Sequence, residues 1–164
     1  IKLMEIKYLT YLRDNPKRYP YDTEHQFPIE AISLQEIENL EQLYNNGNPF
    51  PKALKELLYL AGNSCYVLDY GIWDTQEEIQ NYVRENMIET NRTISRPFYA
   101  IDIYNMGDQF VFIYLDEADD PMVYEGVYDG SVNFPGWIHE LAVKSLSDFI
   151  NHRILRVQEG RSAF

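Results

Sequence analysis

Three alternating apolar segments follow one another closely between residues 98 and 128, and they constrain the fold more than any other feature of the sequence. The segments are residues 98–104, 109–116 and 122–128, and their aromatic and β-branched residues favour strands. Only residues 105–108 and 117–121 connect them, whereas a parallel crossover needs about a dozen residues or more. The sequence therefore predicts an antiparallel meander.

The middle segment is apolar on both of its faces. Its two alternating sets are Phe110, Phe112 and Tyr114 on one face, and Val111, Ile113 and Leu115 on the other. A strand that faces water on one side alternates between apolar and polar residues. The pattern here predicts a central strand that other elements cover on both sides.

Helical spacing of apolar residues predicts helices before and after the meander. Residues 33–36 and 75–78 have the Ser/Thr-x-x-Glu pattern of a capping box, and Pro51 suits the first position of a helix. The predicted helices cover residues 3–14, 34–44, 51–61, 76–87 and a last segment from about residue 145; residues 65–73 are predicted as a strand. The expected fold class is α+β, with a helical first half, a β-meander and a C-terminal helix around an antiparallel sheet.

Composition is typical of one globular domain. The chain has 164 residues, of which 45% are hydrophobic, and no apolar stretch approaches the roughly 20 residues that cross a bilayer. A single cysteine, Cys65, cannot form an internal disulfide and is expected to be a buried structural thiol. These features favour a cytoplasmic protein without membrane contact. The first residue is Ile1 rather than Met, so a leader upstream stays open.

Negative charge is concentrated in one part of the chain. Residues 98–144 carry nine acidic residues and one base, Lys144, which gives −8 of the total formal charge of −12. A protein that binds nucleic acid needs Lys and Arg to neutralise phosphates. The distribution argues against a nucleic-acid partner and favours a basic protein, whose association the acidic residues would accelerate.

Tyrosines and acidic residues alternate through this segment, and together they are suitable anchors for Arg and Lys on a partner. No cofactor is expected. The predicted partner-binding residues are Tyr99, Asp102, Tyr104, Asp108, Tyr114, Asp116, Glu117, Asp119, Asp120 and Tyr124.

Other readings of the acidic residues are weaker. Residues 116–120 hold four acids, but a Ca²⁺ loop needs Gly where Pro121 stands. His139-Glu140 is part of a zinc-protease motif whose second His would fall at Val143. Asp102, Asp108 and Glu140 could supply a carboxylate pair for glycoside hydrolysis, but no spacing selects them. A solvated turn at 116–120 and a small hydrolase therefore stay open as alternatives to partner binding.

Several motifs resemble the SUKH superfamily, which includes fungal cell-wall assembly regulators and many bacterial immunity proteins. The main motif is Phe50-Pro51 followed by a helix that ends at Ala61-Gly62-Asn63; the family pattern has Leu before the Pro and Asn-Gly-Gly at the end. Further similar motifs lie at residues 70–73, 76–79, 107–112, 121–124 and 147–150, so the resemblance covers about residues 32–154.

The resemblance implies a SUKH-like domain over residues 32–164, preceded by an N-terminal helix and extended connection over residues 1–31. It also implies a binding role without catalysis, in which an immunity protein blocks a cognate bacterial toxin, often a nuclease. A regulatory or scaffold domain of the same fold is the alternative. The oligomeric state is not predicted by any of these features.

Overall fold

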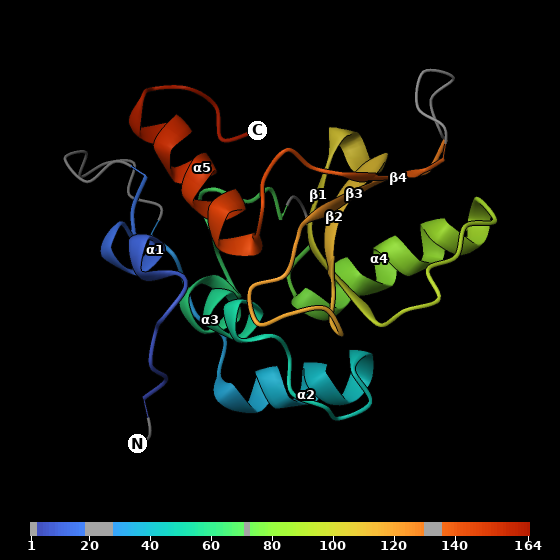
Figure 1. The fold of residues 1–164 in the computed structure, drawn as a ribbon, viewed down its shortest axis with the longest axis horizontal. Coiled ribbons are helices and arrows are strands. Elements are labelled where there is room, and N and C mark those ends of the chain that lie inside the picture. The colour runs from blue at the N-terminus through green and yellow to red at the C-terminus, as the bar shows by residue number, and fades with distance from the viewer. Residues whose placement is uncertain (1–2, 19–27, 71–72, 130–135) are drawn as a thin grey trace.

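The computed structural model describes residues 3–18, 28–70, 73–129 and 136–164. Helices come first, strands follow and a helix closes the chain (Figure 1). The elements are α1 (Thr10–Asp14), α2 (Leu34–Tyr44), α3 (Lys52–Ala61), α4 (Gln76–Glu89), β1 (Phe98–Tyr104), a 3-10 turn (Asn105–Gly107), β2 (Gln109–Tyr114), β3 (Tyr124–Val127), β4 (Ile138–Glu140) and α5 (Leu146–Gln158). The predicted α+β class, with a helical first half, a β-meander and a C-terminal helix, is confirmed.

The four strands form one antiparallel sheet in the order β1-β2-β3-β4. This confirms the meander, because each strand pairs with the next one along the chain. The sequence did not predict β4, whose three residues pair with β3. Residues 130–135, which precede β4 in the sequence, lie outside the described residues.

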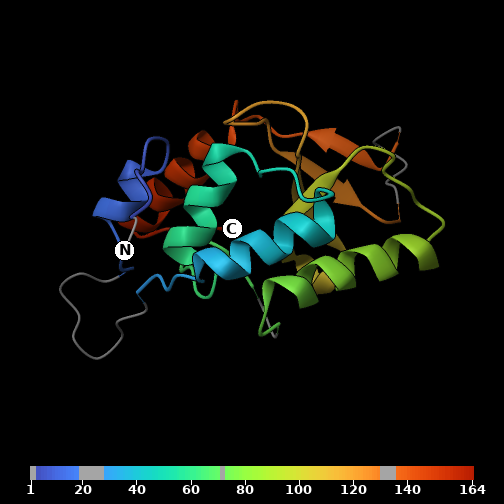
Figure 2. The same cartoon turned by 90° about the horizontal axis from the view of Figure 1, so that it is seen from below.

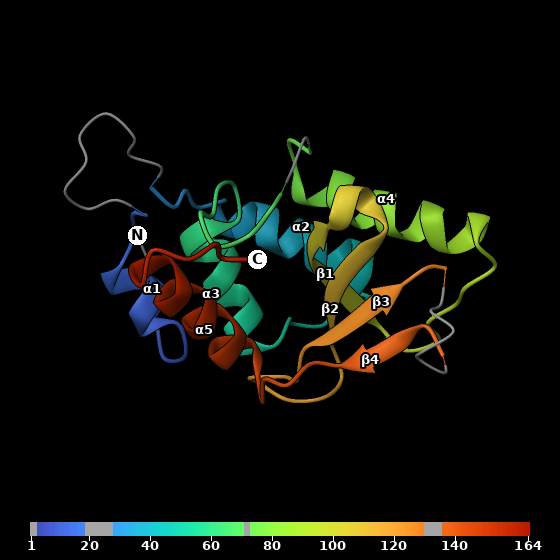
Figure 3. The same ribbon diagram turned by 90° about the horizontal axis from the view of Figure 1, so that it is seen from above.

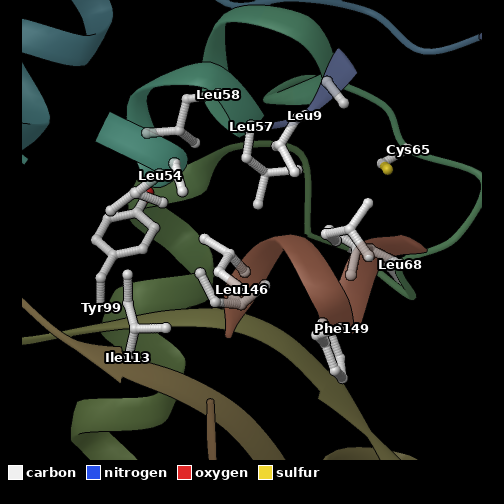
Figure 4. Close-up of a cluster of buried hydrophobic side chains, with 14 of the residues drawn as sticks. Leu9, Leu54, Leu57, Leu58, Cys65, Leu68, Tyr99, Ile113, Leu146 and Phe149 are labelled. Atoms are coloured by element: carbon white, nitrogen blue, oxygen red, sulfur yellow. The ribbon is translucent and has the colours of Figure 1, made fainter. Parts of the chain in front are cut away.

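The sheet separates two hydrophobic cores. On one face Val111 and Ile113 of β2 pack with residues of α1, α2, α3 and α5, a cluster that Figure 4 shows in close-up. On the other face Phe110 and Phe112 pack with the apolar side of α4. Figure 1 shows α4 on the opposite side of the sheet from α1, α3 and α5. The two-sided burial predicted for the middle strand is confirmed.

Side-chain caps fix where the longer helices begin. Ser33 accepts from the amide of Glu36 at 3.1 Å, and the Glu36 carboxylate accepts from the Ser33 amide at 3.0 Å, so the predicted capping box forms at α2. Thr75 accepts from the amide of Glu78 at 3.1 Å at the start of α4. Each cap satisfies an amide that has no partner within its own helix.

The first helix is shorter than the sequence predicts. Helix α1 begins at Thr10, because the backbone amides of Lys7, Tyr8 and Leu9 all donate to one carboxylate oxygen of Glu56 on α3, at 2.8, 2.8 and 3.0 Å. Helix α1 packs beside α5 (Figure 3), and Leu9 and Leu12 are fully buried in the same core as α3 and α5. The N-terminal segment is therefore part of the main domain's core.

The strand predicted over residues 65–73 is wrong for the part that the structure describes. Cys65 and Leu68 close a turn instead, with the Leu68 amide donating to the Cys65 carbonyl at 3.2 Å. Cys65, Val67 and Leu68 are nevertheless buried. The apolar pattern correctly indicated burial, but the segment is a loop packed over the core; residues 71 and 72 lie outside the described residues.

A glutamine from α4 covers the outer edge of β1. Gln80 is fully buried, and its amide group donates to the carbonyl of Ala100 at 2.7 Å while its oxygen accepts from the Ala100 amide at 2.8 Å. Arg84 donates to the carbonyl of Phe98 at 3.0 Å. These side chains take the place of a neighbouring strand and satisfy edge groups that would otherwise be unpaired.

Candidate protein-binding surface

Two of the ten predicted contact residues lie inside the protein, so their prediction as surface anchors is wrong. Tyr99 is 1% exposed, and its hydroxyl donates to the side chain of Gln76 at 2.8 Å. Asp102 is fully buried and pairs with Arg153 of α5 at 2.8 Å. Both side chains stabilise the core rather than facing a partner.

A β-bulge explains the position of Asp102. Ala100 pairs with Phe112 and Asp102 pairs with Val111, so Ile101 is an extra residue in β1. The extra residue shifts the alternation and turns Asp102 toward α5, away from the face that holds Ala100. There its carboxylate accepts from Arg153 and from the backbone amide of Asp69 at 3.0 Å. Burial raises the pKa of Asp102 to about 6, against the opposing effect of Arg153.

The exposed acidic residues among the ten predicted contact residues are divided among separate places on the protein. Asp108 lies at the β1–β2 turn, whereas residues 116–120 follow the opposite end of β2. Tyr104 is half-buried and donates from its hydroxyl to Glu125 of β3. Only part of the predicted set can therefore touch one partner surface together.

The loop over residues 116–121 has a structural role that the sequence analysis missed. Asp120 accepts from the backbone amide and the hydroxyl of Ser147, at 3.0 and 2.6 Å, at the start of α5. The carbonyl of Asp119 accepts from the amide of Ala53 at the start of α3, at 2.9 Å. This loop joins the sheet to two helices, so it is more than a solvated turn.

Four of the predicted residues do come together around Arg96. We call Arg96, Tyr114, Asp116, Glu117 and Tyr124 the tyrosine–carboxylate cluster. The Arg96 guanidinium lies 3.8 Å from the centre of the Tyr114 ring and 2.6 Å from the Asp116 carboxylate. The rings of Tyr114 and Tyr124 are 4.9 Å apart, and the Tyr124 hydroxyl donates to Glu117 at 3.0 Å. All five side chains reach the surface.

Contacts within the cluster fix its charges and its shape. The hydrogen bond from Arg96 lowers the pKa of Asp116, which keeps this carboxylate ionised. Burial, followed by the hydrogen bond to Glu117, raises the pKa of Tyr124 to about 12, so its hydroxyl stays protonated and can donate. Glu117 also accepts from the amide of Met122 at 3.0 Å. Side chains that are already held lose less entropy when a partner binds.

Arg96 is the member of this cluster that the sequence analysis did not select. It precedes β1 and lies twenty residues from Asp116 in sequence, so no local motif links the two. The available signal was that β1 and β2 were predicted to pair as neighbours, which brings the residue before β1 close to the residue after β2. That reasoning requires the register of the pair, which only the structure supplies.

The residues considered for chemistry are not arranged for it within the described residues. Cys65 is buried, and burial raises the pKa of its thiol to about 12, so it is held as a neutral thiol. Asp102 is buried while Asp108 and Glu140 are exposed, so this trio does not share one open site. No group of three or more His, Cys, Asp or Glu side chains could hold a metal ion in the part of the chain that the structure describes.

The fold and the cluster define an α+β protein with a preformed aromatic and acidic surface. No protein-family model, curated protein or solved structure matches the chain. None of the helices within the described ranges has both the length and the apolar character that a membrane span requires.

Proposed function

We propose that this chain is an immunity protein that binds a basic bacterial toxin, of the nuclease type, and neutralises it by covering its surface. The resemblance to the SUKH superfamily over residues 32–154 supports this function, and so does the net charge of −12. A nuclease has a basic surface because its substrate is anionic, and an acidic inhibitor that covers this surface competes directly with the substrate.

The tyrosine–carboxylate cluster is the observation that carries the proposal. It presents two tyrosine rings beside the Asp116 and Glu117 carboxylates, and internal contacts already hold these groups in place. Aromatic side chains beside acids form strong contacts with Arg and Lys of a partner. Arg96 holds the Asp116 carboxylate by hydrogen bonds and offsets part of the negative charge.

A toxicity assay tests the function. The protein encoded beside this chain's gene is expressed in bacteria with and without the chain, and cell survival and co-purification are measured together. The proposal expects survival and a stable complex only when both are present. A neighbouring toxin that kills equally in both conditions, and forms no complex with the chain, would show that the proposal is wrong.

The Tyr124→Ala and Glu117→Gln variants are expected to weaken the complex by roughly tenfold or more each, because they remove an aromatic anchor and a carboxylate. Isothermal titration calorimetry with the co-purified toxin measures the change. Asp108→Asn is the matched control, since this acid is exposed at the opposite end of β2. A loss in Asp108→Asn equal to that in Glu117→Gln would mean that only net charge matters for these acids and would contradict the cluster's role.

A further inference from the structure

A groove of about 360 Å³ lies between α2 and the start of α4, and it contains none of the residues of the tyrosine–carboxylate cluster. The two helices lie side by side (Figure 2). Apolar side chains of Ile32, Leu40 and Leu43 line the groove. Leu43 is 57% exposed, although Leu40 on the same helix is buried. The groove therefore offers an apolar surface that the described residues leave uncovered.

Buried polar contacts hold the inner wall of the groove in place. Gln76 is 6% exposed; it donates to the carbonyl of Gly62 at 2.7 Å and accepts from the Tyr99 hydroxyl at 2.8 Å. Ile32 packs so closely on Gly62 that a side-chain carbon there would lie 2.8 Å from it. A wall with satisfied polar groups and close packing resists collapse, so the groove is preformed for an occupant.

All charged residues that line the groove are acidic. They are Glu36, Asp74 and Glu77, and α2 contains no basic residue. Glu36 is used in the capping box, but the carboxylates of Asp74 and Glu77 make no hydrogen bond or ion pair within the described residues. The start of α4 contributes about half a positive charge, which three carboxylates outweigh. The rim therefore favours a cation and repels acidic peptides and phosphates.

Resting on the function proposed above, we propose that this groove binds a cationic amphipathic segment of the protein partner. An apolar side chain of the segment packs against Leu40 and Leu43, while a neighbouring Lys or Arg pairs with Asp74 and Glu77. The groove is thus a second contact, separate from the tyrosine–carboxylate cluster, and it selects partners with apolar and basic residues on one face.

Peptide binding tests this inference without the toxin. The probe is a short amphipathic peptide with leucines and lysines at helical spacing, and the comparison peptide has glutamate in place of each lysine. Binding of both to the ¹⁵N-labelled chain is followed by NMR titration. We expect the lysine peptide to shift the amides of α2 and of the start of α4, and the glutamate peptide to leave them unchanged. Equal shifts with both peptides, or shifts confined to other regions, would refute the groove site.

Variants with matched controls locate the contact. Leu43→Ser and Glu77→Gln are expected to weaken binding of the lysine peptide by roughly tenfold or more. Leu34→Ser and Glu38→Gln are the controls, because both residues are exposed on α2 and do not line the groove. Losses in the control variants equal to those in the groove variants would also refute the site.

The toxicity assay separates this inference from the proposed function. If Leu43→Ser loses the peptide and yet neutralises and binds the toxin like the unmodified chain, the groove is not a contact and the function stands. If the groove binds the lysine peptide and the chain protects against no neighbouring toxin, the immunity function fails while the peptide site stands.

Discussion

Replacing Glu56 with alanine is expected to lower the free energy of unfolding by about 3–5 kcal/mol. Glu56 is fully buried, and one of its oxygens accepts from three successive amides, those of Lys7, Tyr8 and Leu9. Alanine leaves these donors without an acceptor and removes three hydrogen bonds that attach the N-terminal segment to α3. The other carboxylate oxygen lies 3.8 Å from the Lys52 ammonium, so the substitution also removes this ion pair, and Lys52 keeps its hydrogen bond to the Glu5 carbonyl.

Urea denaturation of the whole chain measures the loss, and hydrogen exchange at the amides of residues 7–9 shows where it arises. Glu56→Gln is the matched control, because glutamine keeps the side-chain length and one oxygen acceptor. It is expected to lose less than half as much stability as alanine. Equal losses for both variants would mean that the negative charge, and not the three hydrogen bonds, holds the segment.

Arg153→Met is expected to destabilise the fold at neutral pH by about 3–5 kcal/mol, because it leaves Asp102 as an uncompensated buried charge. Arg153 is 8% exposed and donates to Asp102 at 2.8 Å and to the carbonyl of Val67 at 3.0 Å. Methionine keeps much of the packing against Phe149 but can make neither hydrogen bond. Urea denaturation at about pH 7.5 measures the change in unfolding free energy.

The stability lost in Arg153→Met is expected to be larger at neutral pH than at about pH 5. In the unmodified chain the pKa of Asp102 is raised to about 6, so the folded state holds more protons than the unfolded state between about pH 4 and 6. The contribution of Asp102 to stability therefore falls as the pH rises through this window. Since Arg153 lowers the pKa of Asp102, removing it extends the window upward, and the variant is expected to recover stability at about pH 5.

The double variant Asp102→Asn/Arg153→Met provides the control for this prediction. It removes both charges together, so it is expected to be more stable than Arg153→Met alone at neutral pH and to lack the recovery at acid pH. A single variant that loses the same stability at about pH 5 and 7.5 would contradict the raised pKa of Asp102 and assign the loss to packing.

Local signals in the sequence predicted most of the elements correctly. The Ser33–Glu36 and Thr75–Glu78 patterns marked helix starts, because a cap acts between residues three apart and needs no distant partner. The short connections fixed the antiparallel order of β1, β2 and β3 for the same local reason. The apolar pattern on both faces of β2 also predicted that other elements cover both sides of this strand, and the two cores confirm it.

Errors arose where a distant residue decides the local structure. Helix α1 starts late because Glu56, nearly fifty residues away, binds the amides before it. Strict alternation along β1 would place Asp102 on the face of Phe98 and Ala100, and only the bulge at Ile101 turns it toward Arg153. Neither the late start of α1 nor the bulge in β1 is indicated by the neighbouring residues, so the spacing of apolar residues could not predict them.

The difference between local signals and the effects of distant residues also applies to the candidate surface. Composition correctly indicated an acidic, tyrosine-rich region, and Tyr114, Asp116, Glu117 and Tyr124 lie together. Composition could not separate them from Tyr99, which has the same chemistry and is buried by the pleat of β1. It also gave no reason to select the groove beside α2, since that site combines residues from three separate parts of the chain.

Because Gln80 covers the outer edge of β1, the two edge strands of the sheet, β1 and β4, are not equally open to pairing with another strand. With the backbone groups of Ala100 already bound to Gln80, another chain cannot add a strand there without first displacing α4. Growth of the sheet by strand exchange or fibril formation must then begin at the three-residue β4. A Gln80→Leu substitution would free the Ala100 groups at this edge and leave only the contact of Arg84 with Phe98, so resistance to self-association at high concentration depends on two polar side chains of α4.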